Sequence, residues 1–401
     1  MNSVQYLLNI ESKGIKLGLE RTHNLMNKCG NPHLGLPSIQ VAGTNGKGSV
    51  CAMIANILKI SGYKTGLFTS PHLVSINERI RINGHPILNS EIDEFITKNK
   101  LHIENTNSTF FESITALAFW YFKKHNVDFA IMETGLGGRL DSVSVCEPIA
   151  TVLTPIALDH VEILGPSITD IAFEKAGIIK KGTPCIVSHQ NKEVLEVIKN
   201  RCKKMNAPIH FVNNKNKITD LFINIPGEVQ TENAHLAIET ITQTKEINVS
   251  KSDIINGLKT VKWYGRNQHI QNKPLIIFDV GHNANGIKSF LKYFKSLKIQ
   301  GETTIIIALQ SRKNISSISQ NIQKIFNTII CTETGGRNPM PAKNLAQNFS
   351  NNKKLKIITN IELAIQNSLK KLCSNDALAI IGSHYIGSAI NNIFNISFEK
   401  Y

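Results

Sequence analysis

A glycine-rich turn at residues 43–49 constrains the fold of this chain more than any other feature of its sequence. The turn reads GTNGKGS, follows the short apolar run 39–42 and precedes the helix-like run 50–61. Glycines let successive backbone N–H groups point to one place without Cβ clashes, and a helix N-terminus adds positive potential there. The pattern predicts a phosphate-binding loop, although a glycine inserted between Lys47 and Ser49 departs from the G-x-x-x-x-G-K-[ST] spacing.

Short apolar runs that end in Gly, Asp or Thr alternate with longer amphipathic stretches, a rhythm typical of parallel strands connected by helices. We expect strands at 39–42, 64–69, 129–133, 150–154 and 185–188, and in a second part at 275–280, 304–309, 328–332 and 377–382. Helix-like segments at 233–245 and 252–260 precede the sequence WYGRN at 263–267, which indicates a domain boundary near 265–273. The Asn- and Lys-rich stretch 213–217 is expected to be a surface loop.

The composition excludes a disordered chain and limits the classes of molecule that we expect the protein to bind. With 401 residues and 41% hydrophobic side chains, the protein is long enough for two or three domains with buried cores. The formal net charge is +15, and residues 268–401 hold 16 basic but only six acidic side chains. Such an excess favours an anionic partner, which could be nucleic acid, a membrane surface or a small polyanion. Few aromatic residues lie among the lysines, which weakens the case for single-stranded nucleic acid.

The cysteines and the N-terminal segment indicate the cellular compartment in which we expect the protein. Seven cysteines without a C-x-x-C pair indicate free thiols in a reducing compartment. Charged residues at 11, 13 and 16 interrupt the apolar pattern of the first residues, and no apolar run approaches the ~18 residues of a membrane helix. We therefore expect a cytoplasmic protein.

Polar side chains end three of the predicted strands. Ser70, Glu133 and His160 each lie at or just beyond a strand's carboxyl end, the edge at which open α/β sheets bind ligands. Together they could hold a Mg²⁺ that also contacts nucleotide phosphates. Histidine is an unusual Mg²⁺ ligand, so a hydrogen-bonded loop histidine is the alternative for His160. Lys175 lies in the helix-like segment 171–179, where a lysine is ordinarily solvated.

The phosphate loop resembles the ATP loop of the Mur ligase superfamily, and further motifs narrow the resemblance to folylpolyglutamate synthase/dihydrofolate synthase. They are TSPHL at 69–73, NERI at 77–80, ETGLGGRLD at 133–141, ALDH at 157–160, EKAGI at 174–178, FDVGHN at 278–283 and GSH at 382–384. They follow the family's order and extend over nearly the whole chain. The resemblance implies an α/β fold with two domains. An N-terminal P-loop ATPase domain of the Mur ligase type, with a mostly parallel central sheet, binds ATP and folate (1–267), and a smaller Rossmann-like domain serves as the glutamate ligase (268–401).

The implied activity is ATP-dependent ligation of L-glutamate to dihydropteroate and to folate polyglutamate tails, through an acyl phosphate. Two Mg²⁺ sites are implied, with room for a monovalent cation. The expected partners are ATP, L-glutamate, dihydropteroate and reduced folates, without nucleic acid or membrane, and we expect a monomer. Three alternatives stay open: an enzyme with one of the two activities, a cell-wall amino-acid ligase, which SPHL and the Phe110–Phe111 pair argue against, and a P-loop nucleic-acid-binding protein, which only charge and the phosphate loop favour.

The resemblance also implies roles for individual residues. The nucleotide set is Gly43, Thr44, Asn45, Gly46, Lys47, Gly48, Ser49, Asn233, Arg266 and Asp279. The metal set is Ser70, Glu133, His160 and Lys175, with Lys175 carbamoylated. The folate and dihydropteroate set is Leu17, Gly18, Leu19, Thr109, Phe110, Phe111, Glu112, Arg139, Leu140 and Asp141, although paired phenylalanines are ordinarily core. Arg79, His282 and Ser383 are assigned to glutamate, and Lys47, Lys175 and His282 to catalysis.

Overall fold

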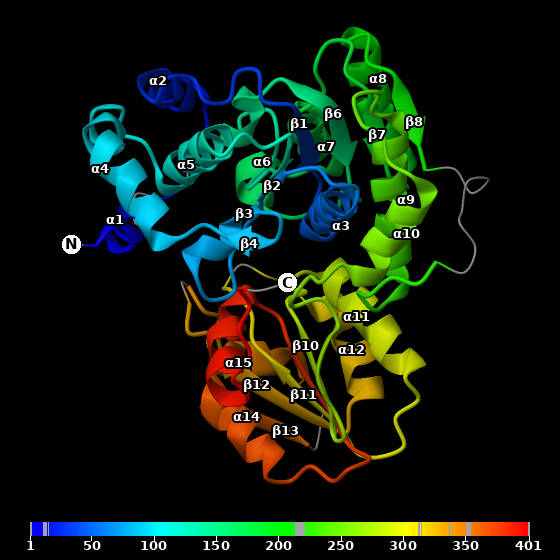
Figure 1. The fold of residues 1–401 in the computed structure, drawn as a ribbon. Coiled ribbons are helices and arrows are strands. Elements are labelled where there is room, and N and C mark those ends of the chain that lie inside the picture. The colour runs from blue at the N-terminus through cyan, green and yellow to red at the C-terminus, as the bar shows by residue number, and fades with distance from the viewer. Residues whose placement is uncertain are drawn as a thin grey trace. The chain divides into compact units, whose positions relative to one another are not determined.

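The computed structural model describes residues 2–10, 14, 16–212, 221–311, 313, 315–336, 338–349 and 354–399. The chain divides into two compact units, each with its own sheet (Figure 1). The first unit comprises 1–224, 230–261 and 399–401, and the second comprises 225–229 and 262–398. The surface loop predicted at 213–217 lies outside the described residues.

The first unit is built on an eight-stranded sheet with the strand order β4-β3-β2-β5-β1-β6-β7-β8. The strands are β1 (Ser38–Ala42), β2 (Thr65–Phe68), β3 (Ile80–Ile82), β4 (His85–Pro86), β5 (Phe129–Glu133), β6 (Pro148–Leu153), β7 (Cys185–Val187) and β8 (Ile209–Phe211). All pairings from β2 to β8 across the sheet are parallel, while β3 and β4 form an antiparallel edge. The carboxyl ends of β2, β5, β1 and β6 therefore lie side by side, which brings the turns that follow them together.

Helices cover both faces of this sheet (Figure 1). They are α1 (Ser3–Ile10), α2 (Glu20–Lys28), α3 (Lys47–Ile60), α4 (Asn89–Asn105), α5 (Phe110–Lys124), α6 (Val161–Leu164), α7 (Ile168–Ala176), α8 (Lys192–Lys204), α9 (Glu228–Gln243) and α10 (Lys251–Thr260). Apolar side chains of α1, α2, α4 and α5 form one core with Ala130 and Met132 of β5. A second core joins α7 and α8 to β6 and β7, and α10 packs on α3.

The second unit has a six-stranded sheet in the order β13-β12-β11-β14-β10-β9. Its strands are β9 (Gln268–Asn272), β10 (Leu275–Asp279), β11 (Thr303–Ile307), β12 (Thr328–Glu333), β13 (Leu355–Asn360) and β14 (Ala377–Ile381), and its helices are α11 (Ala284–Ser296), α12 (Ser316–Ile325), α13 (Ala342–Ala346), α14 (Ile361–Leu369) and α15 (Gly387–Phe394). Only β9 runs antiparallel to its neighbour. Isoleucines of β11 and β12 pack against Phe290 and Phe294 of α11 to form its core.

The predicted α/β class, with mostly parallel sheets, is confirmed. Each strand expected from an apolar run is present within one or two residues of its predicted ends. The strands β3, β4, β8, β9 and β13 were not predicted. The side chains of β4, β8, β9 and β13 are half-buried or exposed, so these strands lack the continuous apolar run of a strand covered on both faces. Strand β3 is mostly buried, but it has only three residues and the charged Arg81 interrupts its apolar pattern.

The first two residues of α9 cluster with the second unit, although the rest of this helix belongs to the first. Asn267 Nδ2 donates a hydrogen bond of 2.8 Å to the Pro226 carbonyl, and Lys292 forms an ion pair with Glu228. A Cβ on Gly227 would lie 2.6 Å from Asn267 Nδ2, so glycine permits this close approach. The second unit is thus assembled from two separated parts of the chain.

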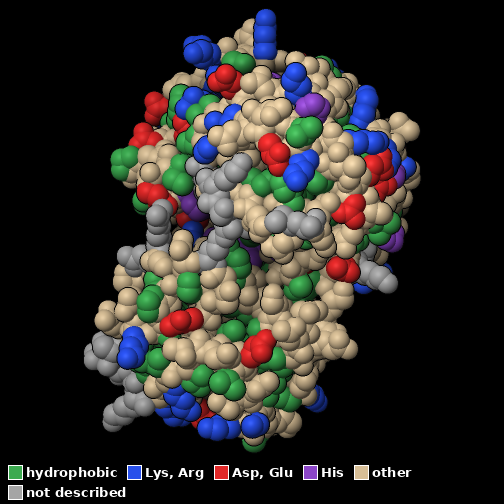
Figure 2. All heavy atoms as spheres, turned by 90° about the vertical axis from the view of Figure 1, so that its left-hand side faces the viewer, with side chains coloured by type: hydrophobic (Ala, Val, Ile, Leu, Met, Phe, Trp, Pro, Cys, Tyr) green, Lys and Arg blue, Asp and Glu red, His purple; other side chains and the backbone are tan. Residues whose placement is uncertain are grey.

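Charged side chains of both signs lie on the face of the molecule shown in Figure 2. On the face shown in Figure 2, Lys and Arg are interspersed with Asp and Glu over the first unit. No helix in the described part of the chain combines the length and the apolar character needed to cross a membrane.

Candidate active site

The predicted phosphate loop connects β1 to α3 as expected. Gly43 and Gly46 have φ angles of +148° and +90°, which side chains rarely adopt. A Cβ on Gly43 would lie 1.8 Å from Thr154 Oγ1, and one on Gly46 would lie 2.6 Å from Asn233 Oδ1. Helix α3 begins after Gly46 without a side-chain cap. Its first N–H groups are therefore suited to an anion such as a phosphate.

Lys47 is the first residue of α3, and its ammonium group stays close to the loop. Nζ donates a 3.4 Å hydrogen bond to the Thr44 carbonyl and lies 3.9 Å from Glu133 Oε1. Two residues further along the helix, Ser49 Oγ is buried and makes no hydrogen bond with another described residue. A buried hydroxyl in that position needs a partner, and a bound metal ion or phosphate would supply one.

Thr44 ties the phosphate loop to the turn that carries His160. Its Oγ1 donates to the Ala157 carbonyl at 3.1 Å and accepts the Ala157 N–H at 3.0 Å, while its own N–H donates to the Pro155 carbonyl at 2.9 Å. Gln190 supports the same turn, because Oε1 accepts the Ile156 N–H and Nε2 donates to the Thr154 carbonyl, both at 3.0 Å. The sequence pattern carries no signal for Gln190, which was not predicted.

The structure brings Ser70 and Glu133 together at the carboxyl ends of adjacent strands. The Ser70 N–H donates to Glu133 Oε2 at 3.0 Å, and Glu133 is only 4% exposed. His160 has a left-handed conformation (φ +52°) at the start of α6, and its side chain is 42% exposed. Within the described residues, no three His, Cys, Asp or Glu side chains form a group that could hold a metal ion. Oxygen ligands from serine, phosphates and water would have to complete a magnesium site.

Lys175 is buried beside the phosphate loop rather than solvated. Only 5% of the residue is exposed, and Nζ donates a 2.7 Å hydrogen bond to the Gly43 carbonyl, 132 residues earlier. Burial, reinforced by the positive charge of Lys47, lowers the pKa of Lys175 from 10.5 to about 7, against the opposing pull of Asp159 and Asp141. A substantial fraction of Lys175 is therefore neutral near pH 7, the form that reacts with CO₂.

The two phenylalanines at the start of α5 have different surroundings. Phe111 lies beneath the turn that follows β5, where a Cβ on Gly135 would come within 2.5 Å of its ring. Phe110 is 6% exposed and has the Arg79 guanidinium carbon 5.1 Å from its ring centroid. Phe111 therefore lies against the turn that follows Glu133, and Phe110 lies against Arg79.

Arg79, assigned to glutamate from the sequence, is buried and engaged within its own unit. Its Nε donates to His72 Nδ1 at 2.8 Å. Burial, together with the Arg79 charge, lowers the pKa of His72 to about 3. The neutral imidazole is thus part of the support for Arg79.

The segment 139–141 contains one half-exposed and one buried charge. Arg139 Nη2 lies 2.8 Å from Glu174 Oε1, and the guanidinium lies over the Phe173 ring at 5.6 Å from its centroid. The Asp141 carboxylate accepts N–H groups of Gly135, Leu136 and Val143 at 2.8–3.0 Å. Burial raises the pKa of Asp141 to about 6. Leu140 between them is half-buried.

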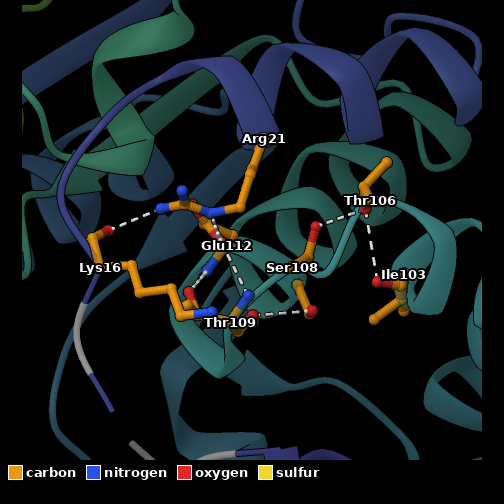
Figure 3. Close-up of polar contacts among 8 residues, drawn as sticks. Lys16, Arg21, Ile103, Thr106, Ser108, Thr109 and Glu112 are labelled. Atoms are coloured by element: carbon orange, nitrogen blue, oxygen red, sulfur yellow. Dashed lines mark hydrogen bonds and ion pairs between the residues drawn. The ribbon is translucent and has the colours of Figure 1, made fainter. Parts of the chain in front are cut away.

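The segments around residues 17–19 and 109–112, which were predicted to bind the folate, are connected through the contacts of Arg21 (Figure 3). Thr109 and Glu112 form a capping box at the start of α5. The Glu112 carboxylate also contacts the guanidinium of Arg21, with Arg21 Nη2 at 2.9 Å from Oε1. Arg21 was not among the predicted site residues, since no local pattern relates it to a position 91 residues away.

The carboxyl end of β10 and the turns that follow β10 and β14 carry Asp279, His282 and Ser383 of the second unit, while the predicted Arg266 lies just before β9. Asp279, 6% exposed, accepts N–H groups of Asn267 at 2.8 Å and Gly281 at 2.7 Å. Burial raises its pKa, while the charge of Arg266 opposes that shift. The rings of His282 and His384 lie 5.4 Å apart, with His282 Nδ1 3.0 Å from the Val280 carbonyl.

The last two predicted residues are both buried polar groups. Ser383 is 3% exposed and accepts the Tyr385 N–H at 3.3 Å. Asn233 is also 3% exposed, lies in the first unit on α9 and donates to Gln230 Oε1 at 3.0 Å. Its carboxamide lies against Gly46, where it defines one side of the phosphate loop.

Comparison with known proteins gives the same family for both parts of the chain. Residues 41–252 match the Mur ligase middle domain, and residues 265–384 match the Mur ligase, glutamate ligase domain. The chain is 34% identical over 347 residues to the dihydrofolate synthase/folylpolyglutamate synthase of Bacillus subtilis, covering 79% of this chain and 81% of that protein. The Escherichia coli protein of the same name is 31% identical over 363 residues, covering 87% and 85%.

Solved structures agree with these relatives. The structure of E. coli FolC in complex with DHPP and ADP has a TM-score of 0.89 and 27% identity, covering 98% of this chain and 96% of that one. The bifunctional folylpolyglutamate synthase/dihydrofolate synthase from Yersinia pestis, complexed with AMPPNP and Mn ion, has a TM-score of 0.89 and 25% identity, covering 99% and 98%.

Proposed function

Since this chain belongs to the folylpolyglutamate synthase/dihydrofolate synthase family of Mur ligases, we propose specific roles for the residues described above in both activities of that family. The protein is an ATP-dependent ligase that joins L-glutamate to folates. The proposal covers dihydropteroate and folate polyglutamate tails as alternative acceptors. The observation that carries it is the convergence of an uncapped, lysine-bearing phosphate loop, the Glu133 carboxylate and buried Lys175 at one sheet edge.

The reaction must first make a carboxylate electrophilic. Transfer of the γ-phosphoryl group from ATP to the acceptor carboxylate forms an acyl phosphate and ADP. Lys47 and the N–H groups at the start of α3 would offset the negative charge of that group. The neutral amine of glutamate then attacks the acyl carbon, the new C–N bond forms, and phosphate leaves.

His282 is the proposed acceptor of the amine proton. The Val280 carbonyl can only accept a hydrogen bond, so the contact at 3.0 Å assigns the imidazole hydrogen to Nδ1. The lone pair then resides on Nε2, the atom that would take up the proton. Ser383 is proposed to contact the glutamate, as is Arg79, whose guanidinium is already held between His72 and Phe110.

Magnesium is the proposed divalent ion, and we propose two sites for it. Ser70, Glu133 and His160 are the residues that would hold it, and the hydroxyl group of Ser49 would be a further oxygen donor. The buried Ser49 Oγ and the Glu133 carboxylate are the hard oxygen donors that Mg²⁺ prefers. The metal would supply Lewis-acid stabilisation of phosphate charge. A monovalent cation remains part of the proposal without a residue assigned to it.

Lys175 is proposed to be carbamoylated. Addition of CO₂ to its neutral amine forms an N–C bond and releases a proton, which converts a buried cation into an anion able to bind a metal ion. The lowered pKa and the burial of Lys175 support this modification. The Gly43 carbonyl, which now accepts from Nζ, would retain the remaining N–H as its donor.

The other assignments remain proposals of the same kind. Asn45, Gly48, Asn233, Arg266 and Asp279 are proposed to contact the nucleotide. Leu17, Gly18, Leu19, Thr109, Phe110, Phe111, Glu112, Arg139, Leu140 and Asp141 are proposed to form or support the site of the pterin-bearing acceptor. We also propose 1–267 and 268–401 as the two domains, and a cytoplasmic monomer, which the seven free cysteines support as far as location is concerned.

The deciding experiment is a steady-state assay of ADP release by the purified protein with Mg²⁺. We expect turnover only when L-glutamate and either dihydropteroate or tetrahydrofolate are both present, with no effect of added DNA or RNA. Acceptor labelled with ¹⁸O in its carboxylate should transfer one label to the released phosphate. ATP hydrolysis without an acceptor, or phosphate without label, would contradict the proposal, and turnover with only one acceptor would identify a single-activity enzyme.

A further inference from the structure

A buried carboxylate at the start of α5 is paired with an arginine from a distant part of the chain. Glu112 is 2% exposed, and its Oε2 accepts the Thr109 N–H at 2.7 Å within the capping box. Arg21 Nε donates to Oε1 at 3.0 Å and to Oε2 at 3.2 Å, and Arg21 Nη2 lies 2.9 Å from Oε1. The capping box alone would leave this buried charge without a counter-ion, so Arg21 is the group that compensates it.

Arg21 makes a second contact with the same guanidinium. Nη2 also donates to the Lys16 carbonyl at 2.9 Å, so one planar group joins Glu112 on α5 to the backbone just before residues 17–19 (Figure 3). The fork geometry of arginine permits both bonds at once, whereas the point charge of a lysine cannot reproduce this arrangement.

The ion pair is not needed to attach α2 itself to the first unit. Leu25 and Met26 of α2 are fully buried, and they belong to the core that includes α1, α4 and α5. By contrast, the preceding segment has few anchors: Leu17 is 41% exposed, and Leu19 packs partly buried against this core but provides no side-chain cap for α2. The contact with the Lys16 carbonyl therefore acts mainly on the course of the segment 16–19.

We propose that Arg21 is a positioning residue for the pterin-bearing acceptor, because it holds the segment 16–19 against the start of α5 through Glu112. This inference rests on the proposed function, which assigns residues 17–19 and 109–112 to that acceptor. The expected ligand is a flat, bicyclic heteroaromatic system joined to an aryl carboxylate, of which dihydropteroate is the example. Arg21 itself does not contact the reacting atoms, so its loss acts on acceptor binding and not on the phosphoryl transfer.

The test compares Arg21→Gln and Arg21→Lys with the wild-type enzyme, with dihydropteroate as the varied substrate. We expect Arg21→Gln to raise KM for dihydropteroate at least tenfold, and Arg21→Lys to raise it by a smaller factor, because lysine retains the charge but not the fork. KM for ATP and kcat at saturating dihydropteroate should stay within twofold of wild type. Lys98→Gln, which breaks the exposed ion pair with Glu94 on α4, is the matched control and should leave all three constants unchanged.

Two further measurements keep the outcome decisive. Thermal unfolding with and without ATP shows whether each variant is folded and still binds nucleotide, and calorimetric titration with dihydropteroate measures acceptor affinity without turnover. An unchanged affinity for dihydropteroate in folded Arg21→Gln would overturn the inference, as would equal losses for ATP and dihydropteroate. If wild-type protein fails to bind dihydropteroate, the dihydrofolate-synthase part of the proposed function is wrong, which separates the two failures.

Discussion

Two turns of this protein each connect the carboxyl end of a strand to a helix, but they begin their helices differently. The turn after β1 leads into α3 through Gly46, which offers no side-chain cap. The turn after β10 leads into α11 through Asn283, whose Oδ1 accepts the Gly286 N–H at 2.8 Å. Both turns contain glycine and both belong to family motifs. Because the first N–H groups of a helix have no partner within it, the uncapped turn retains all of them for a ligand.

The comparison shows that glycine content alone does not identify a phosphate loop. The first turn also has a lysine at the start of its helix, a buried Ser49 hydroxyl that makes no hydrogen bond within the described part of the chain, and a second lysine, Lys175, against its backbone. The second turn satisfies its own N–H groups, through Asn283 at the helix and through Asp279, which binds Asn267 and Gly281. We therefore expect substitutions in the first turn to affect nucleotide chemistry and those in the second turn's cap to affect stability.

The largest effect should come from Lys47→Ala. Removal of the charge beside the transferring phosphate should lower kcat/KM for ligation by about a thousandfold, by analogy with the loss of one preorganised donor to a developing charge. Lys288→Ala, an exposed lysine on α11, is the matched control and should retain full activity. Circular dichroism would verify the fold of both variants, and substantial turnover by folded Lys47→Ala would refute the role of this lysine.

Lys175→Ala should lower kcat by about 100-fold, in the range found when the environment of a metal ligand is disrupted. Small carboxylates such as acetate should restore part of the activity, since they can occupy the space of the carbamate. The modification needs the neutral amine, whose pKa is about 7, so wild-type activity should rise as pH increases through 7 and should respond to bicarbonate. A ¹³C-NMR signal from labelled bicarbonate on wild type, absent in the variant, would verify the carbamate. Full activity without additive would show that it is dispensable.

Gly46→Ala should weaken nucleotide binding about tenfold. The new Cβ would meet Asn233 Oδ1 at 2.6 Å in a backbone conformation with φ of +90°, and strain of this kind costs about 1–3 kcal/mol. Gly286→Ala provides the parallel change in the second turn, where the nearest atoms are 3.3 Å away and φ is not positive. Titration with ADP would measure the nucleotide affinity of both variants. Equal losses of affinity would contradict the distinction between the two turns.

The smallest effect is expected from Asn283→Ala. Loss of the cap on α11 should lower the free energy of unfolding by about 1 kcal/mol, the ordinary value of an N-cap. KM for ATP should stay unchanged, because the capped N–H groups do not serve a phosphate. Urea unfolding measures the first quantity and steady-state kinetics the second. A conservative Asn283→Ser variant should recover most of the lost stability.

Patterns within single segments of the sequence predicted much of the fold. Most of the features that these patterns missed are contacts between segments that lie far apart in the sequence. The strand–turn–helix around residues 43–49 and the positions of the parallel strands along the chain follow from local glycine, lysine and apolar spacing. The pairing of Arg21 with Glu112 spans 91 residues, and the bonds between Thr44 and Ala157 span 113. No periodicity reports such pairs, because they depend on which loops the folded sheet places together.

Burial also changed the interpretation of single charged residues. Lys175, on a helix where solvation is ordinary, is buried against the Gly43 carbonyl, and only the family motif pointed to it. Asp141 and Glu112 were assigned to a substrate from the sequence. In the structure, both carboxylates accept hydrogen bonds from backbone N–H groups, and Glu112 also forms an ion pair with Arg21. Sequence motifs therefore nominated the residues of the candidate site, while the contacts within the first unit needed the three-dimensional structure.

The assembly of the second unit from two parts of the chain has a practical consequence for anyone who wishes to express that unit alone. A fragment that begins at residue 262 lacks the Pro226 carbonyl that Asn267 binds and the Glu228 carboxylate that pairs with Lys292. A simple truncation would thus produce a protein with a severed tertiary contact at Asn267, the residue whose N–H contacts Asp279. A peptide of residues 225–229, grafted ahead of residue 262 by a flexible linker, would be the minimum needed to restore it.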